Sequence, residues 1–542
     1  MTRKKASIPF FIGLAIALGI LIGSTFNYKN KSILFSSDSK EVKIKKLINF
    51  IQYDYVDKVD TDSLLDATIT NMLVKLDPHS VYIPKEELQR VTESMQGKFV
   101  GIGVSFLMHE DSVVVSSIIK GGPSEKAGIL EGDRIIVADK DTLFGSSIVE
   151  RAGINGEERS FIIRNRKITN EVMKALKGEP ETSVDLEIYR RSIGETLKIT
   201  IPRGEVSIKS VPSHYMISSN LGYINIDRFA RTTYDEFKIG LDELVGKGME
   251  SLVLDLRGNP GGFMDIANSI IDEFLEDGKL IVFTKNKNGD VNRSFATSEG
   301  DFENGKVYVL IDQNSASASE IVAGALQDND KGIIVGRRSF GKGLVQQEMD
   351  LGDGSAVRLT TSRYYTPTGR SIQKPYSKKD TKQYSNDYLR RIHNGELIYK
   401  DSIKVDDKLK YTTPKGKIVY GGGGIIPDVF VSIDTTNNYS NRLYRDLNSF
   451  VFKYVDNNRV ELNKWDIEGF EKDFDLENKV FDEYVNQLDL NSPIFPREAA
   501  ELKLYLNAII ARNLFGETGF LMITHKKDAM ILKVIELEGI TD

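Results

Sequence analysis

Hydrophobic and polar positions follow three different patterns along the chain. Residues 42–56 and 62–77 carry apolar side chains three and four positions apart, which is the spacing of amphipathic helices. Short strand-like runs follow, and from residue 221 onward apolar runs alternate with amphipathic segments. The fold class is therefore multidomain α/β, and we expect a helical N-terminal region at 41–95, a β-rich unit at 98–205 and an α/β core at 206–434.

The last part of the chain, residues 438–542, is charged and its apolar spacing is helical. It contains the only tryptophan, Trp465, and no motif that indicates a function. We expect a helical C-terminal extension of unknown role.

The β-rich unit combines short strands with two helix-like segments, at 123–133 and 168–178. The strings GIGVSF (101–106) and GGPSEKAGILEGDRII (121–136) resemble those of a PDZ domain. One departure is a long insertion at 142–167, which we expect to reshape one rim of the peptide groove.

The PDZ resemblance implies a binding site for protein C-termini. In such a domain, successive backbone N–H groups capture the terminal carboxylate while the peptide adds as a strand to a sheet edge. Val104 and Phe106 are expected to line an apolar pocket together with Ile102. The carboxylate-binding loop is then expected at Gly101, Ile102, Gly103 and Val104.

The α/β core contains two glycine-rich segments, RGNPGG (257–262) and SFGKG (339–343). Each follows an apolar, strand-like run, and the first opens a helix-like segment. The plain interpretation of the first is a turn before a helix. Residues 374–417 are polar and rich in lysine, and we expect them to form a surface insertion.

The N-terminus combines the basic string MTRKK with an uncharged apolar run at 8–26. That run is just long enough to span a bilayer core, and its basic flank favours a cytoplasmic N-terminus. A cleaved signal peptide is the alternative interpretation. Residues 1–28 are thus expected to be an anchor or signal sequence, and both interpretations export the rest of the chain.

Composition excludes several classes of function. The 542 residues have a net charge of −6, with 72 basic and 78 acidic side chains, so no basic footprint for nucleic acid exists. The chain lacks cysteine, which excludes disulfides, zinc thiolate sites and a cysteine nucleophile. None of its five histidines stands three or four residues from another. We expect no metal or other cofactor.

A run of alternating serines, SASASEIVAGALQD (315–328), precedes a helical pattern. A helix N-cap accounts for one serine, and Glu320 in the first turn suits the positive end of the helix dipole. The alternative is that one serine is a nucleophile at a helix N-terminus, where N–H groups stabilise an oxyanion. Lys342 could then be its base, because desolvation favours a neutral amine, although most loop lysines are simply solvated.

Four strings together decide between these alternatives: LDLRGNPGG (254–262), SASASEIVAGALQD, VGRRSFGKGLVQ (335–346) and LTTSRYYTPTGRSIQ (359–373). They resemble the carboxy-terminal processing proteases, in the order found in that family, and the resemblance covers roughly residues 41–433. The family has a crotonase-like α/β protease core with an inserted PDZ domain and a Ser–Lys dyad. Many family members have glycine or another small residue at the position of Pro260. This difference removes no catalytic group.

The resemblance implies a role for each matched residue. Ser317 would be the nucleophile, Lys342 the general base and Gln346 the residue that orients the lysine. Backbone N–H groups of Gly262 and Ala318 would form the oxyanion hole. In this interpretation Ser319 caps the helix and Ser315 is a supporting hydrogen-bond residue.

The resemblance also implies a cellular setting. We expect an endopeptidase of the bacterial cell envelope, anchored in the inner membrane with its catalytic domain in the periplasm. Its partners would be protein or peptide substrates with free apolar C-termini, the membrane through the N-terminal segment, and further copies in a possible homo-oligomer. Two alternatives remain: a non-catalytic, membrane-anchored PDZ scaffold and a crotonase-type acyl-thioester enzyme.

Overall fold

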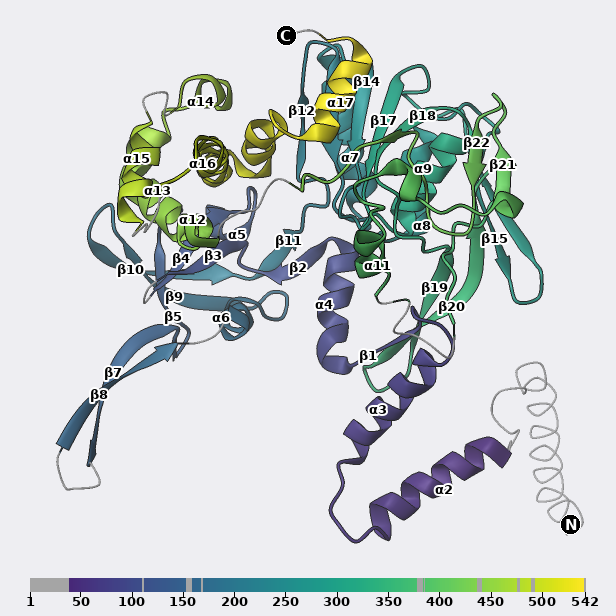
Figure 1. Cartoon of the computed structure of the whole chain (residues 1–542). Coiled ribbons are helices and arrows are strands. Elements are labelled where there is room, and N and C mark those ends of the chain that lie inside the picture. Colours follow the sequence, from purple (N-terminus) through teal and green to yellow (C-terminus); the bar gives the residue numbers. More distant parts are fainter. Residues whose placement is uncertain are drawn as a thin grey trace, which may run out of the picture. The chain divides into compact units, whose positions relative to one another are not determined.

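The computed structural model describes residues 39–109, 112–152, 158–166, 169–377, 384, 386–435, 441–474, 478–488 and 493–540 (Figure 1). The chain divides into two compact units, residues 1–73 and 74–542. The first unit holds α2 (Ser39–Tyr53) and nearly all of α3 (Thr61–Val74). The predicted anchor at 1–28 lies outside the described residues, and no helix within them is long and apolar enough to cross a membrane.

A six-stranded sheet forms the centre of the second unit. Its strand order is β12-β13-β14-β17-β18-β23, with only β12 antiparallel to its neighbour. Parallel neighbours need crossover connections, and helices supply them here. The strands are β12 (Ser213–Met216), β13 (Leu221–Asn225), β14 (Ser251–Asp255), β17 (Lys306–Ile311), β18 (Gly332–Gly336) and β23 (Val429–Phe430); the helices are α7 (Thr233–Gly246), α8 (Met264–Asp272) and α9 (Ala318–Asp328).

Both faces of this sheet are buried, which explains its nearly continuous apolar strands. Side chains of α7, α8 and α9 share one hydrophobic cluster with the sheet. The opposite face packs against α17 (Ala529–Glu538), seen beside the sheet in Figure 1. A second, antiparallel sheet contains β1 (Val81–Ile83), β15 (Leu280–Asn286), β16 (Val291–Phe295), β19 (Leu344–Asp350) and β20 (Ala356–Tyr365). The predicted α/β class is confirmed.

The PDZ-like unit has its own core and its own sheet, in the order β10-β9-β5-β4-β3, with β6 beside β5. The chain enters through β2 (Lys98–Gly101) and leaves through β11 (Gly204–Ser207), which pair with each other. The other elements are β3 (Val104–His109), β4 (Ser112–Ile118), α5 (Pro123–Lys126), β5 (Arg134–Ala138), β6 (Asp141–Thr142), α6 (Thr169–Leu176), β9 (Ser183–Arg190) and β10 (Glu195–Pro202). The insertion forms a separate hairpin of β7 (Phe144–Ala152) and β8 (Glu158–Arg166).

The described residues of the C-terminal extension form helices with a hydrophobic core of their own. At Gly516, φ 70° and ψ −158° break α16, and the chain after this residue returns to the central sheet. Leu521, Met530, Ile531 and Val534 pack there, so the end of the chain belongs to the protease core. The extension's helices are α12 (Asn441–Tyr444), α13 (Leu447–Leu462), α14 (Ile467–Asp473), α15 (Lys479–Gln487), α16 (Pro496–His525) and α17.

Most of the described residues in 374–417 are exposed, as their composition suggests, but some of the charged side chains in this segment are buried. Lys374, Asp387 and Arg391 are only 5%, 4% and 2% exposed. Their charges are compensated inside the fold, since Asp387 pairs with Lys374 at 3.2 Å and with Arg391 at 3.0 Å. Composition alone cannot distinguish such buried pairs from solvated charges. The segment contains α11 (Asp387–His393), short 3₁₀ turns at Lys400–Ser402 and Asp407–Leu409, and the hairpin of β21 (Lys410–Thr412) and β22 (Ile418–Tyr420).

Candidate active site

Ser317 stands at the N-cap of α9 in a backbone conformation that is unusual for a residue with a side chain. Its φ is 57° and its ψ is −113°, a combination that costs energy and persists only where the surroundings enforce it. Ser317 is half-buried, whereas Ser315 and Ser319 are completely buried. Only the middle serine of the run therefore reaches the surface.

The flanking serines hold the glycine-rich loop in place. The Ser315 hydroxyl donates to Leu256 O at 2.8 Å, which is the supporting role expected of it. The prediction that Ser319 caps α9 is wrong, because Ser317 occupies the N-cap and the Ser319 hydroxyl donates to Asn259 O at 3.1 Å. With Ser317 as the N-cap, α9 begins at Ala318, two residues earlier than a cap at Ser319 would place it.

The RGNPGG loop lies directly against the serine. A Cβ on Gly261 would stand 2.7 Å from Ser317 Cβ and 2.9 Å from Ala318 N, so no larger residue fits at this position. Gly262 has φ +150° and is exposed. Within the described residues, the N–H groups of Gly262 and Ala318 have no hydrogen-bond acceptor. Two free N–H groups beside a serine form the arrangement that stabilises an oxyanion.

Lys342, in the FGKG loop, is half-buried. Its Nζ donates to Gln346 Oε1 at 2.8 Å, and Gln346 Nε2 in turn donates to His79 O. Burial is the largest cause that lowers the pKa of Lys342, and the positive charge of Arg358 lowers it further. A hydrogen bond between Lys342 Nζ and Ser317 is not among the contacts of the described residues.

Glu320 connects the serine to the lysine, a role that its sequence position did not reveal. Its carboxylate accepts from Ser317 N at 2.9 Å, Lys342 N at 2.8 Å, Gly341 N at 2.7 Å and Ser339 Oγ at 2.5 Å. Burial raises its pKa, and these hydrogen bonds oppose that change. A proton on either oxygen would displace a donor, so the geometry fits the ionised carboxylate. The sequence offered one signal, a carboxylate in the first turn of the helix.

Three further residues support the same pair of loops. The Tyr364 hydroxyl donates to Lys342 O at 2.8 Å and to Ser317 O at 3.2 Å. Arg391 donates to Ser339 O at 2.8 Å and to Phe340 O at 3.2 Å. His79 is half-buried, and burial and nearby Lys342 lower its pKa to about 4. Its carbonyl, however, orients Gln346.

The carboxylate-binding loop of the PDZ-like unit has a suitable geometry. Gly103 has φ +77°, and within the described residues the N–H groups of Ile102 and Gly103 have no acceptor. β3 is an edge strand of its sheet, and among the described residues no other strand pairs with its outer side. Val104 and Phe106 are partly buried against the core, whereas Ile102 is 2% exposed and belongs to the core itself.

Known protein families match four stretches of the chain. Residues 220–382 match peptidase family S41 and residues 100–160 match the PDZ domain. Residues 24–87 match a family described as the N-terminal domain of the activating protease CtpB, and residues 439–516 match a family of unknown function. The last match ends at Gly516, where α16 breaks.

Curated relatives extend over most of the chain. Over 384 residues it is 34% identical to the carboxy-terminal-processing protease of Bartonella bacilliformis. The aligned region covers 69% of this chain and 81% of the relative. Over 370 residues it is 34% identical to the carboxy-terminal processing protease CtpB of Bacillus subtilis, with coverages of 67% and 71%. For CtpA of the same organism the identity is 33% over 418 residues, with coverages of 75% and 84%.

The chain belongs to the carboxy-terminal processing proteases of peptidase family S41. The predicted family and the predicted enzyme class, a serine-type peptidase, are thereby confirmed. The PDZ domain is confirmed as well. The roles assigned to Ser317, Lys342, Gln346, Gly262 and Ala318 remain predictions for this protease. Among its described residues, no group of three or more histidine and acidic side chains is placed to hold a metal ion.

Proposed function

We propose that this protease is an exported, membrane-tethered endopeptidase that cleaves by a Ser–Lys mechanism. The observation that carries the proposal is the combination of a half-buried lysine hydrogen-bonded to Gln346 with two free N–H groups beside Ser317. A solvated loop lysine would remain charged at neutral pH and could not accept a proton. Burial favours the neutral amine that a general base requires.

The reaction proceeds in two steps. Ser317 Oγ attacks the scissile carbonyl carbon while Lys342 Nζ takes the hydroxyl proton, and the oxyanion accepts from Gly262 N and Ala318 N. The lysine then gives its proton to the leaving amine, which departs and leaves an acyl ester on Ser317. Water attacks this ester with Lys342 as base again, and the acid product and the free serine are released.

The PDZ domain selects the substrate in this proposal. A protein tail adds antiparallel to β3, and its terminal carboxylate accepts from the N–H groups of Ile102 and Gly103. An apolar final side chain suits the surface around Val104 and Phe106, which are partly buried and carry no charge.

The remaining parts of the proposal concern the setting. Residues 1–28 anchor the chain in the inner membrane and place the catalytic domain in the periplasm, or they direct secretion if cleaved. The core is crotonase-like, with its glycine loop used for peptide instead of thioester chemistry. The proposal also includes a homo-oligomer, with a number of subunits that has to be measured.

Tail recognition is tested with one protein substrate in three forms: an apolar free tail, the same tail amidated, and a tail ending in two aspartates. Charge-assisted hydrogen bonds contribute roughly 1.5–3 kcal/mol each, so amidation is expected to weaken capture at least about tenfold. Only the first form should be cleaved rapidly, and a short tail-independent peptide serves as control. Equal cleavage of all three forms would contradict tail recognition by this domain.

A further inference from the structure

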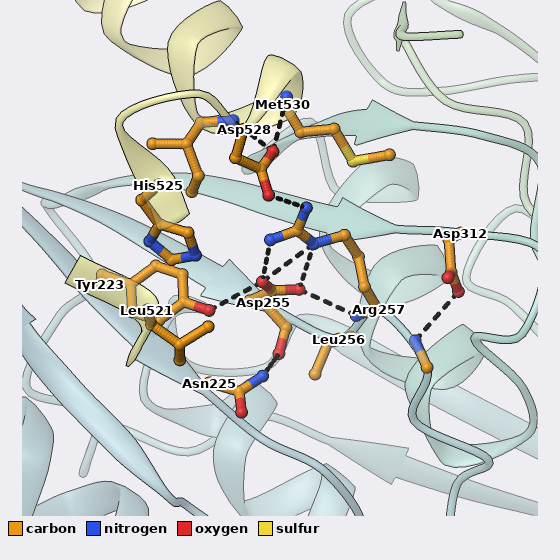
Figure 2. Close-up of polar contacts among 12 residues, drawn as sticks. Tyr223, Asn225, Asp255, Leu256, Arg257, Asp312, Leu521, His525, Asp528 and Met530 are labelled. Atoms are coloured by element: carbon orange, nitrogen blue, oxygen red, sulfur yellow. Dashed lines mark hydrogen bonds and ion pairs between the residues drawn. The ribbon is translucent and has the colours of Figure 1, made fainter. Parts of the chain in front are cut away.

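The N-cap residue of the last helix makes two kinds of contact. Asp528 Oδ1 accepts from Met530 N at 2.9 Å and Ile531 N at 3.3 Å, which starts α17. Its other oxygen, Oδ2, accepts from Arg257 Nη1 at 2.6 Å. Figure 2 shows this arrangement, with the carboxylates of Asp528 and Asp255 on different sides of the Arg257 guanidinium.

Arg257 opens the RGNPGG loop and is held in a fixed orientation. Its Nε donates to Asp255 Oδ1 at 2.9 Å and its Nη2 to Asp255 Oδ2 at 2.6 Å. Tyr223 also donates to Asp255, at 2.8 Å. Such paired contacts between guanidinium and carboxylate fix geometry as well as charge. Despite the opposing effect of burial, Arg257 keeps the pKa of Asp528 below its usual value.

The loop after Arg257 leads directly to the predicted oxyanion hole. Gly258 N donates to Asp312 Oδ1 at 3.0 Å, and this oxygen also accepts from Ser315 N at 3.1 Å. Asn259 Oδ1 accepts from Gly261 N at 2.8 Å, and Asn259 O accepts from Ala316 N at 3.0 Å. Arg257, Gly258, Asn259 and Gly261 are thus each held by a hydrogen bond, and Gly262 follows them directly.

The end of the chain is itself rigidly placed. Met530, Ile531 and Val534 are 3%, 1% and 0% exposed and pack against the central sheet. His525, just before the N-cap, is buried and hydrogen-bonded to Tyr215, and burial lowers its pKa to about 4. Its ring is therefore neutral near pH 7 and does not compete with Arg257 for the carboxylate of Asp528. The packing of α17 on the central sheet therefore fixes the position of Asp528 relative to Arg257.

We propose that Asp528 is a positioning residue for catalysis: it holds Arg257, and through Arg257 the backbone of the loop that presents Gly262 N to the oxyanion. This inference rests on the proposed Ser–Lys function and adds the last helix of the chain to its machinery. Loss of one oxyanion donor reduces kcat about 10²–10³-fold, so partial misplacement should reduce it about tenfold.

Asp528→Ser tests the inference, because serine still caps a helix but is too short to reach Arg257. Asp466→Ser is the matched control: Asp466 caps α14 by accepting from Gly469 N at 2.7 Å and is exposed. The readouts are kcat and KM for a peptide, the burst of p-nitrophenol from a peptide ester, and inhibition by a peptide aldehyde that forms a tetrahedral adduct.

The expected result for Asp528→Ser is a kcat about tenfold lower, a KM within about twofold, and a burst of full amplitude but slower rate. The aldehyde should bind about tenfold more weakly, and Asp466→Ser should match the wild type. A reduced burst amplitude with an unchanged rate per site would mean that Asp528 only stabilises the fold, and would overturn the inference.

Asp528→Asn is the second variant, in case the serine variant does not fold. Asparagine has a single amide oxygen, which keeps the cap, and its amide nitrogen then faces Arg257 and cannot accept from it, so kcat should fall about as far as in Asp528→Ser. Unchanged kinetics in a folded variant would contradict the positioning role of Asp528 and would leave the proposed Ser–Lys function untouched. A wild-type enzyme that hydrolyses the ester without acylation of Ser317 would instead contradict the proposed acyl-enzyme mechanism.

Discussion

Lys342 is the residue whose protonation state decides whether the proposed chemistry occurs. Burial lowers its pKa most, Arg358 lowers it further, and the negative charge of Glu320 acts in the opposite direction. Since only the neutral amine accepts a proton, kcat/KM should rise with pH as Lys342 loses its proton.

Arg358→Gln tests this dependence. Removing a positive charge near Lys342 raises the lysine's pKa, so the rise in kcat/KM should move to higher pH. Arg363→Gln on the same strand is the control, since Arg363 is not among the charges that act on Lys342. A pH profile that does not move in Arg358→Gln would argue against Lys342 as the titrating base.

Lys342→Arg distinguishes a base from a mere positive charge. A guanidinium stays protonated at all working pH values and cannot take the serine's proton. The variant should lose at least about 10³-fold in kcat while its thermal unfolding stays near that of the wild type. Retained activity in this variant would contradict the proposal that Lys342 is the general base.

At the scale of elements, the start of α9 and the FGKG loop act as one assembly through Glu320. Glu320→Gln replaces one accepting oxygen with an amide that donates, so buried N–H groups lose their acceptor at about 1–3 kcal/mol each. The midpoint of thermal unfolding should fall and kcat should drop about tenfold. Because Glu320 raises the pKa of Lys342, the rise in kcat/KM should move to lower pH, opposite to Arg358→Gln. A shift in the same direction for both variants would contradict this electrostatic picture.

The elements were largely predictable from sequence because their apolar spacing is strong. The strands and helices around Ser317 lie where the pattern indicates, and RGNPGG and FGKG flank the serine as expected. Contacts that depend on tertiary structure were not predictable. The cap by Ser317 needs a positive φ that no propensity indicates, and Asp528 reaches Arg257 from 271 positions away in sequence. Lys374 and Arg391 look like surface residues until their partner Asp387 is placed.

At the scale of the whole molecule, the proposed anchor should be separable from catalysis. Residues 1–28 contain none of the predicted catalytic residues. A chain of residues 29–542 should therefore be soluble and cleave peptides at the wild-type rate, while the full chain should sediment with membranes. If the full-length gene product is recovered soluble and begins near residue 25, residues 1–28 contain a cleaved signal and not an anchor.

The central claim, that Ser317 forms the acyl-enzyme, is tested most directly by acid-quenching the reaction with a slowly deacylated peptide ester. Mass spectrometry of the digested protein then locates the acyl group. The account predicts one acyl group, on the peptide that contains Ser317, absent in Ser317→Ala and strongly reduced in Lys342→Ala. An acyl group on another residue, or equal acylation of Ser317→Ala, would contradict it.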